Sequence, residues 1–196
     1  MPAFNDALDL KAAVGDHIGN RSVSDVWPRL VQMAETLLNQ RLRTNWQVKD
    51  DTLTFTAGQA DLPADFLEMI DVYGPCGYRM HAGLRSDTQR PGMSRSRYSI
   101  DGGKVFIRGY TGDKDILYYG VIPTISGSLS ASNWLLERNG DVYLYAVGFE
   151  AAKFLKDVDL AQVSKTLLDE AIKSLKVDDD RQRWSNGIVR VAGLTP

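Results

Sequence analysis

The chain has 196 residues, of which 43% are hydrophobic and 24% are charged, and its formal net charge is −2. This length is enough for one domain with a full core or for two small domains, and the composition is that of a folded globular protein. The nearly neutral charge provides no general basic excess for nucleic-acid binding, although a local basic stretch remains open.

The cysteine content and the apolar runs indicate the cellular compartment in which the protein is expected. Cys76 is the single cysteine, so an internal disulfide is excluded and nothing in the sequence indicates an oxidising compartment. The opening stretch MPAFNDALDLKAAVGD carries early acidic residues and lacks the apolar run of a signal peptide. No apolar run reaches the ~18 residues of a membrane span. We therefore expect a soluble, intracellular protein.

Residues 1–47 are predicted to form a helical hairpin. The first helix has apolar residues at helical spacing, namely Ala7, Leu10, Val14 and Ile18. The segment GNRSVSD ends it, and the second helix follows with Ser24 as the expected N-cap. Arg41 and Arg43 lie in the expected last turn of this second helix, where cations stabilise the helix dipole.

Residues 50–125 are predicted to form a small antiparallel sheet or sandwich. The segment SRYSIDGGKVFIRGY is the clearest hairpin signal, because apolar residues alternate on two arms around Asp101-Gly102-Gly103. Two glycines at the turn adopt a positive φ at little cost. The preceding segment RSDTQRPGMSRS has the composition of a mobile loop.

Residues 133–187 are predicted to form a helical pair. Asp141 is the expected cap of the first helix, which is apolar on nearly every side, since only Glu150 and Lys153 interrupt the run from Val142 to Leu155. Asp159 and Gln162 resemble a capping box for the second helix, which should stop at Asn186-Gly187. Residues 188–196 form an extended tail.

These patterns predict an α+β fold in which the N-terminal and C-terminal helices pack as a bundle and the whole chain, residues 1–196, is a single domain. The over-apolar helix admits two interpretations. Its own chain covers it on all sides, or one flank meets a neighbouring subunit through aromatic side chains of the kind enriched at interfaces, namely Tyr143, Tyr145 and Phe149.

No motif for catalysis or for metal or cofactor binding is present in the sequence. His17 and His81 lie in different parts of the chain, and His17 is expected to be a partly exposed packing residue. The stretch DGGK resembles a phosphate loop but lacks the following helix, so we interpret it as a hairpin turn. Adjacent acids at 178–180 point in different directions on a helix and are expected to be solvated. We therefore predict a non-enzyme without cofactors.

The arginine-rich loop 85–97 leaves a second function open. It contains Arg85, Arg90, Arg95 and Arg97 with little aromatic interleaving. A solvated loop, or one ordered by an acidic neighbouring protein, is favoured, but a small nucleic-acid-binding or regulatory module remains the alternative function.

Taken in order, several segments resemble the head–tail adaptor (connector) proteins of tailed bacteriophages. They are DLKAAVGDHIGNRS, LVQMAETLLNQRLRT, LPADFLEM, YSIDGGKVFI, ILYYGVIPTIS and, most specifically, NWLLERNGDVYLYAVGFEAAKFLKD. The resemblance runs from about Asp9 to Val191. The chain departs from it at Gly140, where the family commonly has proline, in lacking a tryptophan in the first helix, and in the poorly matched loop RSDTQRPGMSRS.

The resemblance implies a structural virion protein at the head–tail junction, assembled in the host cytoplasm. Such adaptors form a ring, commonly a dodecamer, under the portal, extend the DNA channel and provide the platform for the tail. The implied partners are the portal protein, a tail or nozzle protein, further copies of the chain, and viral DNA that passes without sequence-specific binding. By the same likeness, Arg41 and Arg43 join the candidate subunit interface, and the tail residues Ile188, Val189, Arg190 and Val191 dock on the portal.

Overall fold

The structure, a computed structural model, describes residues 4–74, 77–85 and 97–185. The chain divides into two compact units. A helical unit is built from residues 1–46 and 122–196, and a β unit from residues 47–121. The predicted α+β class is confirmed, with helices before and after a region of small sheets.

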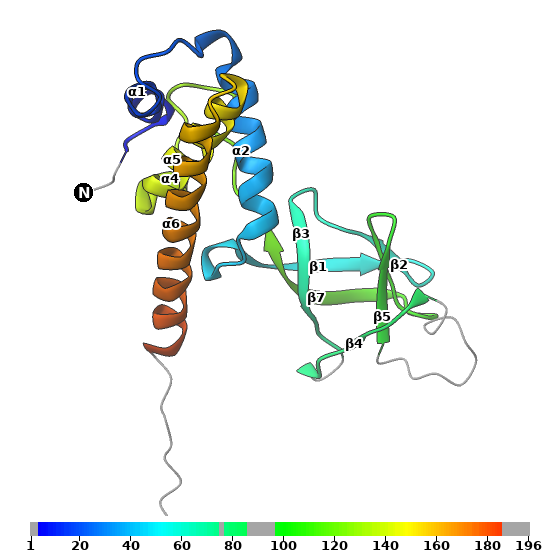
Figure 1. The fold of residues 1–196 in the computed structure, drawn as a ribbon. Coiled ribbons are helices and arrows are strands. Elements are labelled where there is room, and N and C mark those ends of the chain that lie inside the picture. Colours follow the sequence, from blue (N-terminus) through cyan, green and yellow to red (C-terminus); the bar gives the residue numbers. More distant parts are fainter. Residues whose placement is uncertain (1–3, 75–76, 86–96, 186–196) are drawn as a thin grey trace, which may run out of the picture. The chain divides into compact units, whose positions relative to one another are not determined.

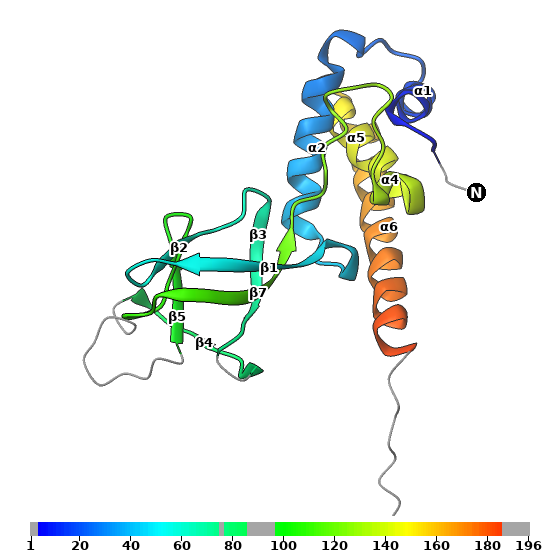
Figure 2. The same ribbon diagram turned by 180° about the vertical axis from the view of Figure 1, so that it is seen from behind.

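The helical unit is arranged around one central helix. Figure 2 shows this helix, α5, between α2 on one side and α1 and α4 on the other, and α6 also packs along it. Its helices, including the short 3₁₀ turn η1, have these bounds: α1 Ala7–His17, η1 Ser24–Val26, α2 Trp27–Arg41, α4 Trp134–Arg138, α5 Gly140–Phe154 and α6 Val158–Ser185. Figure 1 shows α1 nearly end-on where α2 runs lengthwise, so the two N-terminal helices cross steeply and do not lie antiparallel.

Short polar side chains fix where three of these helices begin. The Asp6 carboxylate accepts hydrogen bonds from two backbone N–H groups of the first turn of α1, and the Asn133 side chain does the same for α4. The Asp157 carboxylate accepts from the backbone N–H of Leu160 in α6. Each cap satisfies donors that the helix itself leaves unpaired, and a cap of this kind contributes about 1 kcal/mol.

Three predicted caps are wrong. Ser24 begins the 3₁₀ turn η1, and α2 follows without a side-chain cap. Asp141 lies inside the first turn of α5, whose N-cap Asn139 makes no side-chain hydrogen bond. Asp159 lies inside α6, which Asp157 caps instead. In each case the chain enters the helix earlier or later than periodicity alone suggests, because tertiary packing sets the first turn.

The centre of the helical unit is made by α5. The buried residues of this helix include Val142, Tyr143, Ala146, Val147, Ala151 and Ala152. The alanines among them are small and let neighbouring helices approach closely. Leucines of α1, α2, α4 and α6 complete the same core cluster. Complete burial of each such leucine contributes about 1.5–3 kcal/mol relative to exposure. The apolar run is therefore covered largely by its own chain.

The β unit contains two small sheets. In the first the strand order is β1-β7-β3 (Val48–Phe55, Gly112–Gly120, Phe66–Val72), and all pairs are antiparallel. In the second the order is β2-β6-β5-β4 (Gln59–Asp61, Lys104–Phe106, Arg97–Asp101, His81–Ala82), and only the β4–β5 pair is parallel. A single apolar cluster takes side chains from both sheets, as in a sandwich.

The predicted hairpin is confirmed. Asp101 pairs with Lys104 across the turn, and Gly102 and Gly103 have φ values of 56° and 77°. Both glycines thus occupy the left-handed region that a two-residue turn of this kind demands. Its predicted apolar side chains are buried except for Ile100 beside the turn, which is 40% exposed.

Candidate functional site

The predicted interface residues of α5 have different surroundings. Tyr143 is completely buried within its own unit, so it has no exposed surface for a neighbouring subunit. Tyr145 and Phe149 are half-buried. The Tyr145 ring packs edge-on against His17, and the Lys153 ammonium lies 4.9 Å from the centroid of the Phe149 ring.

A buried polar network joins α2, α4, α5 and the segment after the β unit. The Glu35 carboxylate accepts a hydrogen bond from the backbone N–H of Ile125 at 2.7 Å and from the Thr124 hydroxyl at 2.7 Å. The Tyr143 hydroxyl lies 3.5 Å from the same carboxylate and accepts a hydrogen bond from the Asn133 amide at 2.9 Å. No local sequence pattern indicates this network, because its members are far apart along the chain.

Burial sets the protonation behaviour of this Glu35 network. Loss of solvation raises the pKa of Glu35, and the hydrogen bonds from Ile125, Thr124 and Tyr143 oppose the shift. Burial also raises the pKa of Tyr143, and the nearby carboxylate adds to this effect. The network therefore packs the helices together, and the raised pKa of Tyr143 keeps its hydroxyl protonated.

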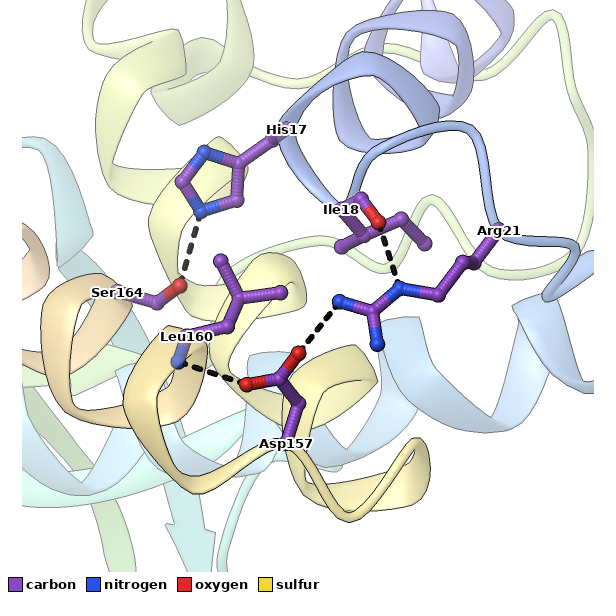
Figure 3. A network of polar contacts seen from close by, with 6 residues as sticks. All are labelled: His17, Ile18, Arg21, Asp157, Leu160 and Ser164. Atoms are coloured by element: carbon purple, nitrogen blue, oxygen red, sulfur yellow. Dashed lines mark hydrogen bonds and ion pairs between the residues drawn. The ribbon is translucent and has the colours of Figure 1, made fainter.

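A second polar network fastens α1 to α6 (Figure 3). The His17 imidazole Nε2 lies 2.9 Å from the Ser164 hydroxyl, and Ser164 is completely buried. The Arg21 guanidinium donates to the Ile18 carbonyl and pairs with the Asp157 carboxylate at 2.6 Å. Because Asp157 also caps α6, a single carboxylate both starts α6 and binds the segment after α1.

The imidazole of His17 reaches α6 by passing over Gly148. A Cβ atom at position 148 would lie 2.7 Å from the His17 ring, so a side chain there would displace it. Burial lowers the pKa of His17, which favours its neutral form. The prediction of a partly exposed packing histidine is confirmed, and the reason for a glycine in the middle of α5 becomes clear.

Arg41 and Arg43, the cations of the predicted interface, both make contacts within their own unit. Arg41 forms an ion pair with Asp169 of α6. Arg43 lies beyond the end of α2 and donates to the backbone carbonyls of Asn39 and Leu42. Both side chains remain partly exposed, which leaves them surface for a neighbouring molecule.

The prediction that the whole acidic run near the end of α6 is solvated is wrong for one of its three residues. Asp178 and Asp180 are exposed, but Asp179 is 5% exposed. Its carboxylate accepts from the backbone N–H of Asn45 and pairs with Arg183. Glu150 of α5 is also buried, since its side chain is only 4% exposed, and it forms an ion pair with Lys153 one turn further along the helix.

Two exposed apolar features of the helical unit were missed by the sequence reasoning. Leu8 and Leu129 form the first, which we name the apolar knob. They are 54% and 42% exposed and adjacent, since the Leu8 backbone N–H donates to the Leu129 carbonyl. The second, which we name the α2–α5 groove, has a volume of about 250 Å³ and is lined by Val26, Arg29, Leu30, Met33, Glu150, Lys153 and Phe154.

Several residues that the sequence analysis singled out lie outside the described residues. They are the single cysteine Cys76, the loop residues Arg90 and Arg95, and the predicted portal-docking residues Ile188, Val189, Arg190 and Val191. Of the remaining arginines of loop 85–97, Arg85 pairs with Asp101 and its guanidinium stacks over the Phe106 ring at 4.2 Å. Arg85 is thus engaged by its own β unit.

Searches of the described residues for other kinds of site were negative. In the ranges 4–74, 77–85 and 97–185, no group of three or more His, Cys, Asp or Glu residues could hold a metal ion. No helix in those ranges has the length and apolar character to cross a membrane. Every buried side-chain nitrogen or oxygen atom there has a hydrogen-bond partner.

Within the described residues, the buried polar groups are used for packing, and the apolar knob and the α2–α5 groove face outward. The model of the SU10 adaptor protein family matches residues 5–192. The chain belongs to this family of bacteriophage head–tail adaptors, and the resemblance noted in the sequence is confirmed. No match was found among curated proteins.

Proposed function

We propose that this adaptor protein assembles as a ring under the portal, most simply a dodecamer, where it extends the DNA channel and provides the platform to which the tail attaches. Family membership over residues 5–192 carries this proposal. The chain is a structural protein of the virion, reaches the head–tail junction from the host cytoplasm, and has no catalytic role.

The character of the helical unit supports a part in assembly. Its core is closed by buried polar contacts, so the unit presents a fixed surface to its neighbours. Tyr145, Phe149, Arg41 and Arg43 are partly exposed members of the proposed subunit interface. A ring also needs two different complementary surfaces on each subunit, because its contacts are head-to-tail.

The partners follow from the same position. The tail residues Ile188, Val189, Arg190 and Val191 dock on the portal, by strand addition or by insertion into a groove. The opposite side of the ring receives the tail or nozzle protein. Viral DNA passes through the ring without sequence-specific binding, and the net charge of −2 suits this role because a strongly basic channel would hold the genome.

The test combines the purified protein with its cognate portal. We expect a stoichiometric ring on the portal, visible by electron microscopy and by mass measurement, and we expect particles made without this protein to lose DNA and to lack tails. A matched variant that ends at residue 187 should fold normally but fail to bind the portal. If no ring forms and particles without the protein keep their DNA and gain tails, the proposed function is wrong.

A further inference from the structure

The α2–α5 groove is an apolar recess with positive charge beside it. Met33 and Phe154 are 43% and 53% exposed in its wall. Lys153 is paired with Glu150, whereas Arg29 has no ion-pair partner within the described part of the chain. An apolar surface of this kind, with an unpaired cation at its edge, suits an apolar side chain that is followed by a carboxylate.

Along α1, the apolar knob is followed by a line of exposed residues that supplies both an apolar side chain and a carboxylate. Leu8, Ala12 and Asp16 are exposed and four residues apart, so they form one line along α1. Asp16 makes no ion pair among the described residues. The stripe therefore offers a leucine, a small residue that permits close approach, and a free carboxylate.

The sizes of knob and groove agree. An apolar cavity of about 150 Å³ holds a benzene molecule, and the groove has a volume of about 250 Å³. It therefore has room for the Leu8 side chain together with part of Leu129. Exposed leucine surface buried in this way would be removed from water on both partners, which is the main driving force of association.

Knob and groove lie on opposite flanks of the helical unit. On α5, Gly148 faces His17 of α1 and Glu150 borders the groove, and two residues along a helix correspond to about 160° around its axis. On α2, Pro28 lines a pocket together with Leu129, whereas Leu30 lines the groove, and the separation around the helix axis is again about 160°.

This placement selects a contact between copies. Because the knob and the groove lie on opposite flanks, the knob of a chain cannot enter the groove of the same chain. Both features lie beside the first half of α2, so a second copy displaced sideways brings its knob to the groove. Repetition of such a contact leaves one free knob and one free groove on a growing chain until a ring closes.

We infer that the knob of one copy, formed by Leu8 and Leu129, occupies the α2–α5 groove of the next copy, with Asp16 of the first facing Arg29 of the second. The inference rests on the proposed ring and names the surfaces that join its subunits. The occupant is another copy of this chain, and the contact is head-to-tail.

Paired cysteines test this contact directly. In a Cys76→Ala background, the double variant Leu8→Cys with Met33→Cys is oxidised at high protein concentration, both alone and with the portal, and separated without reductant. We expect a ladder of dimers, trimers and larger species that collapses on reduction, because each copy can bond to two neighbours. Each single variant should stop at dimers.

The matched control keeps the knob cysteine and moves the second one to α6, as Leu8→Cys with Val177→Cys, since Val177 is also 42% exposed. A control ladder as strong as that of the test pair, or no ladder in the test pair under either condition, overturns the inference. A ring on the portal without the specific ladder rejects this contact and leaves the adaptor function standing. The specific ladder without portal binding supports this contact and rejects the adaptor function.

Discussion

The helical unit and the β unit place their carboxylates differently. Among the described residues, the carboxylates that are buried all belong to the helical unit, namely Glu35, Glu150 and Asp179. In the β unit the paired acids are exposed or partly exposed, as in Lys49–Asp65 and Lys104–Asp61. The helical unit therefore places carboxylates inside its packing, and the β unit keeps its paired carboxylates at the surface.

This difference indicates which unit tolerates amino-acid substitutions better. A buried hydrogen-bonded group whose partner is removed costs about 1–3 kcal/mol, whereas an exposed ion pair contributes roughly 0–1 kcal/mol. The helical unit thus has a more narrowly specified structure, as the proposed ring-building part requires. The β unit can vary at its surface with little loss. Amide hydrogen exchange can test this contrast, because it measures the stability of each unit separately.

The largest loss of stability is expected at Tyr143, because its ring lies in the apolar core and its hydroxyl belongs to the Glu35 network. Replacement by alanine removes a completely buried aromatic ring and leaves Asn133 and Glu35 without their hydroxyl partner. We expect a loss of about 3–5 kcal/mol in the stability of the helical unit. The measurement is amide exchange in α5, with β7 of the β unit as the internal reference.

Tyr143→Phe is the matched control, because it keeps the ring and removes only the hydroxyl. It should lose about 1–2 kcal/mol. Equal exchange rates for α5 in the wild type and in Tyr143→Ala would contradict the view that the polar network closes this core.

The next effect concerns the pH dependence of the helical unit. The pKa of Glu35 is raised by burial, so the folded unit holds a proton that the unfolded chain releases. Stability should therefore fall as pH rises from 4.5 through the raised pKa, and should be fully recovered below 4.5. Glu35→Gln should flatten this part of the stability curve, as followed by exchange in α2 at several pH values.

An exposed carboxylate of the same unit provides the control for this prediction. Asp180→Asn changes one charge on α6 without touching the core, and the curve should keep its slope. If Glu35→Gln retained the wild-type slope between pH 4.5 and neutrality, the carboxylate would not be the titrating group.

Local patterns were enough to predict much of the fold. The helices around Ala7 and Leu30, the hairpin at Gly102-Gly103 and the apolar character of α5 all depend on residues close together in sequence. The caps were less predictable, since Asp157 rather than Asp159 starts α6. The position of an N-cap depends on where the preceding helix ends, and tertiary packing determines that end.

The candidate surfaces were harder to predict for a physical reason. The knob unites Leu8 with Leu129, and the groove unites α2 with the end of α5, so neither exists until the chain folds. Tyr143 had the right composition for an interface but is covered by α2 and α4. Periodicity identifies an over-apolar helix and leaves open which neighbour covers each flank.

The smallest effect is expected for the Lys49–Asp65 pair on the β unit. Hydrogen bonding to Lys49 lowers the pKa of Asp65, and the Tyr118 hydroxyl donates to the same carboxylate at 3.0 Å. Because the folded pKa is depressed, this contribution is present above pH 3.8 and is lost as pH falls through the lowered value. Asp65→Asn should cost less than about 1 kcal/mol at neutral pH.

The sign of this pH effect is the sharper test, because acidification to pH 4.5 should stabilise the helical unit by removing the buried charge of Glu35. Acidification from pH 3.8 through the lowered pKa of Asp65 should instead weaken the β unit. Tyr118→Phe serves as the control, since it removes one hydrogen bond to Asp65 and leaves Lys49 in place. At neutral pH, exchange in β7 should respond more to Asp65→Asn than to this control, and the difference should disappear in acid. A loss from Asp65→Asn as large as that from Tyr143→Ala would mean that surface charge specifies the β unit as strictly as buried charge specifies the helical unit, and the contrast between the two would fail.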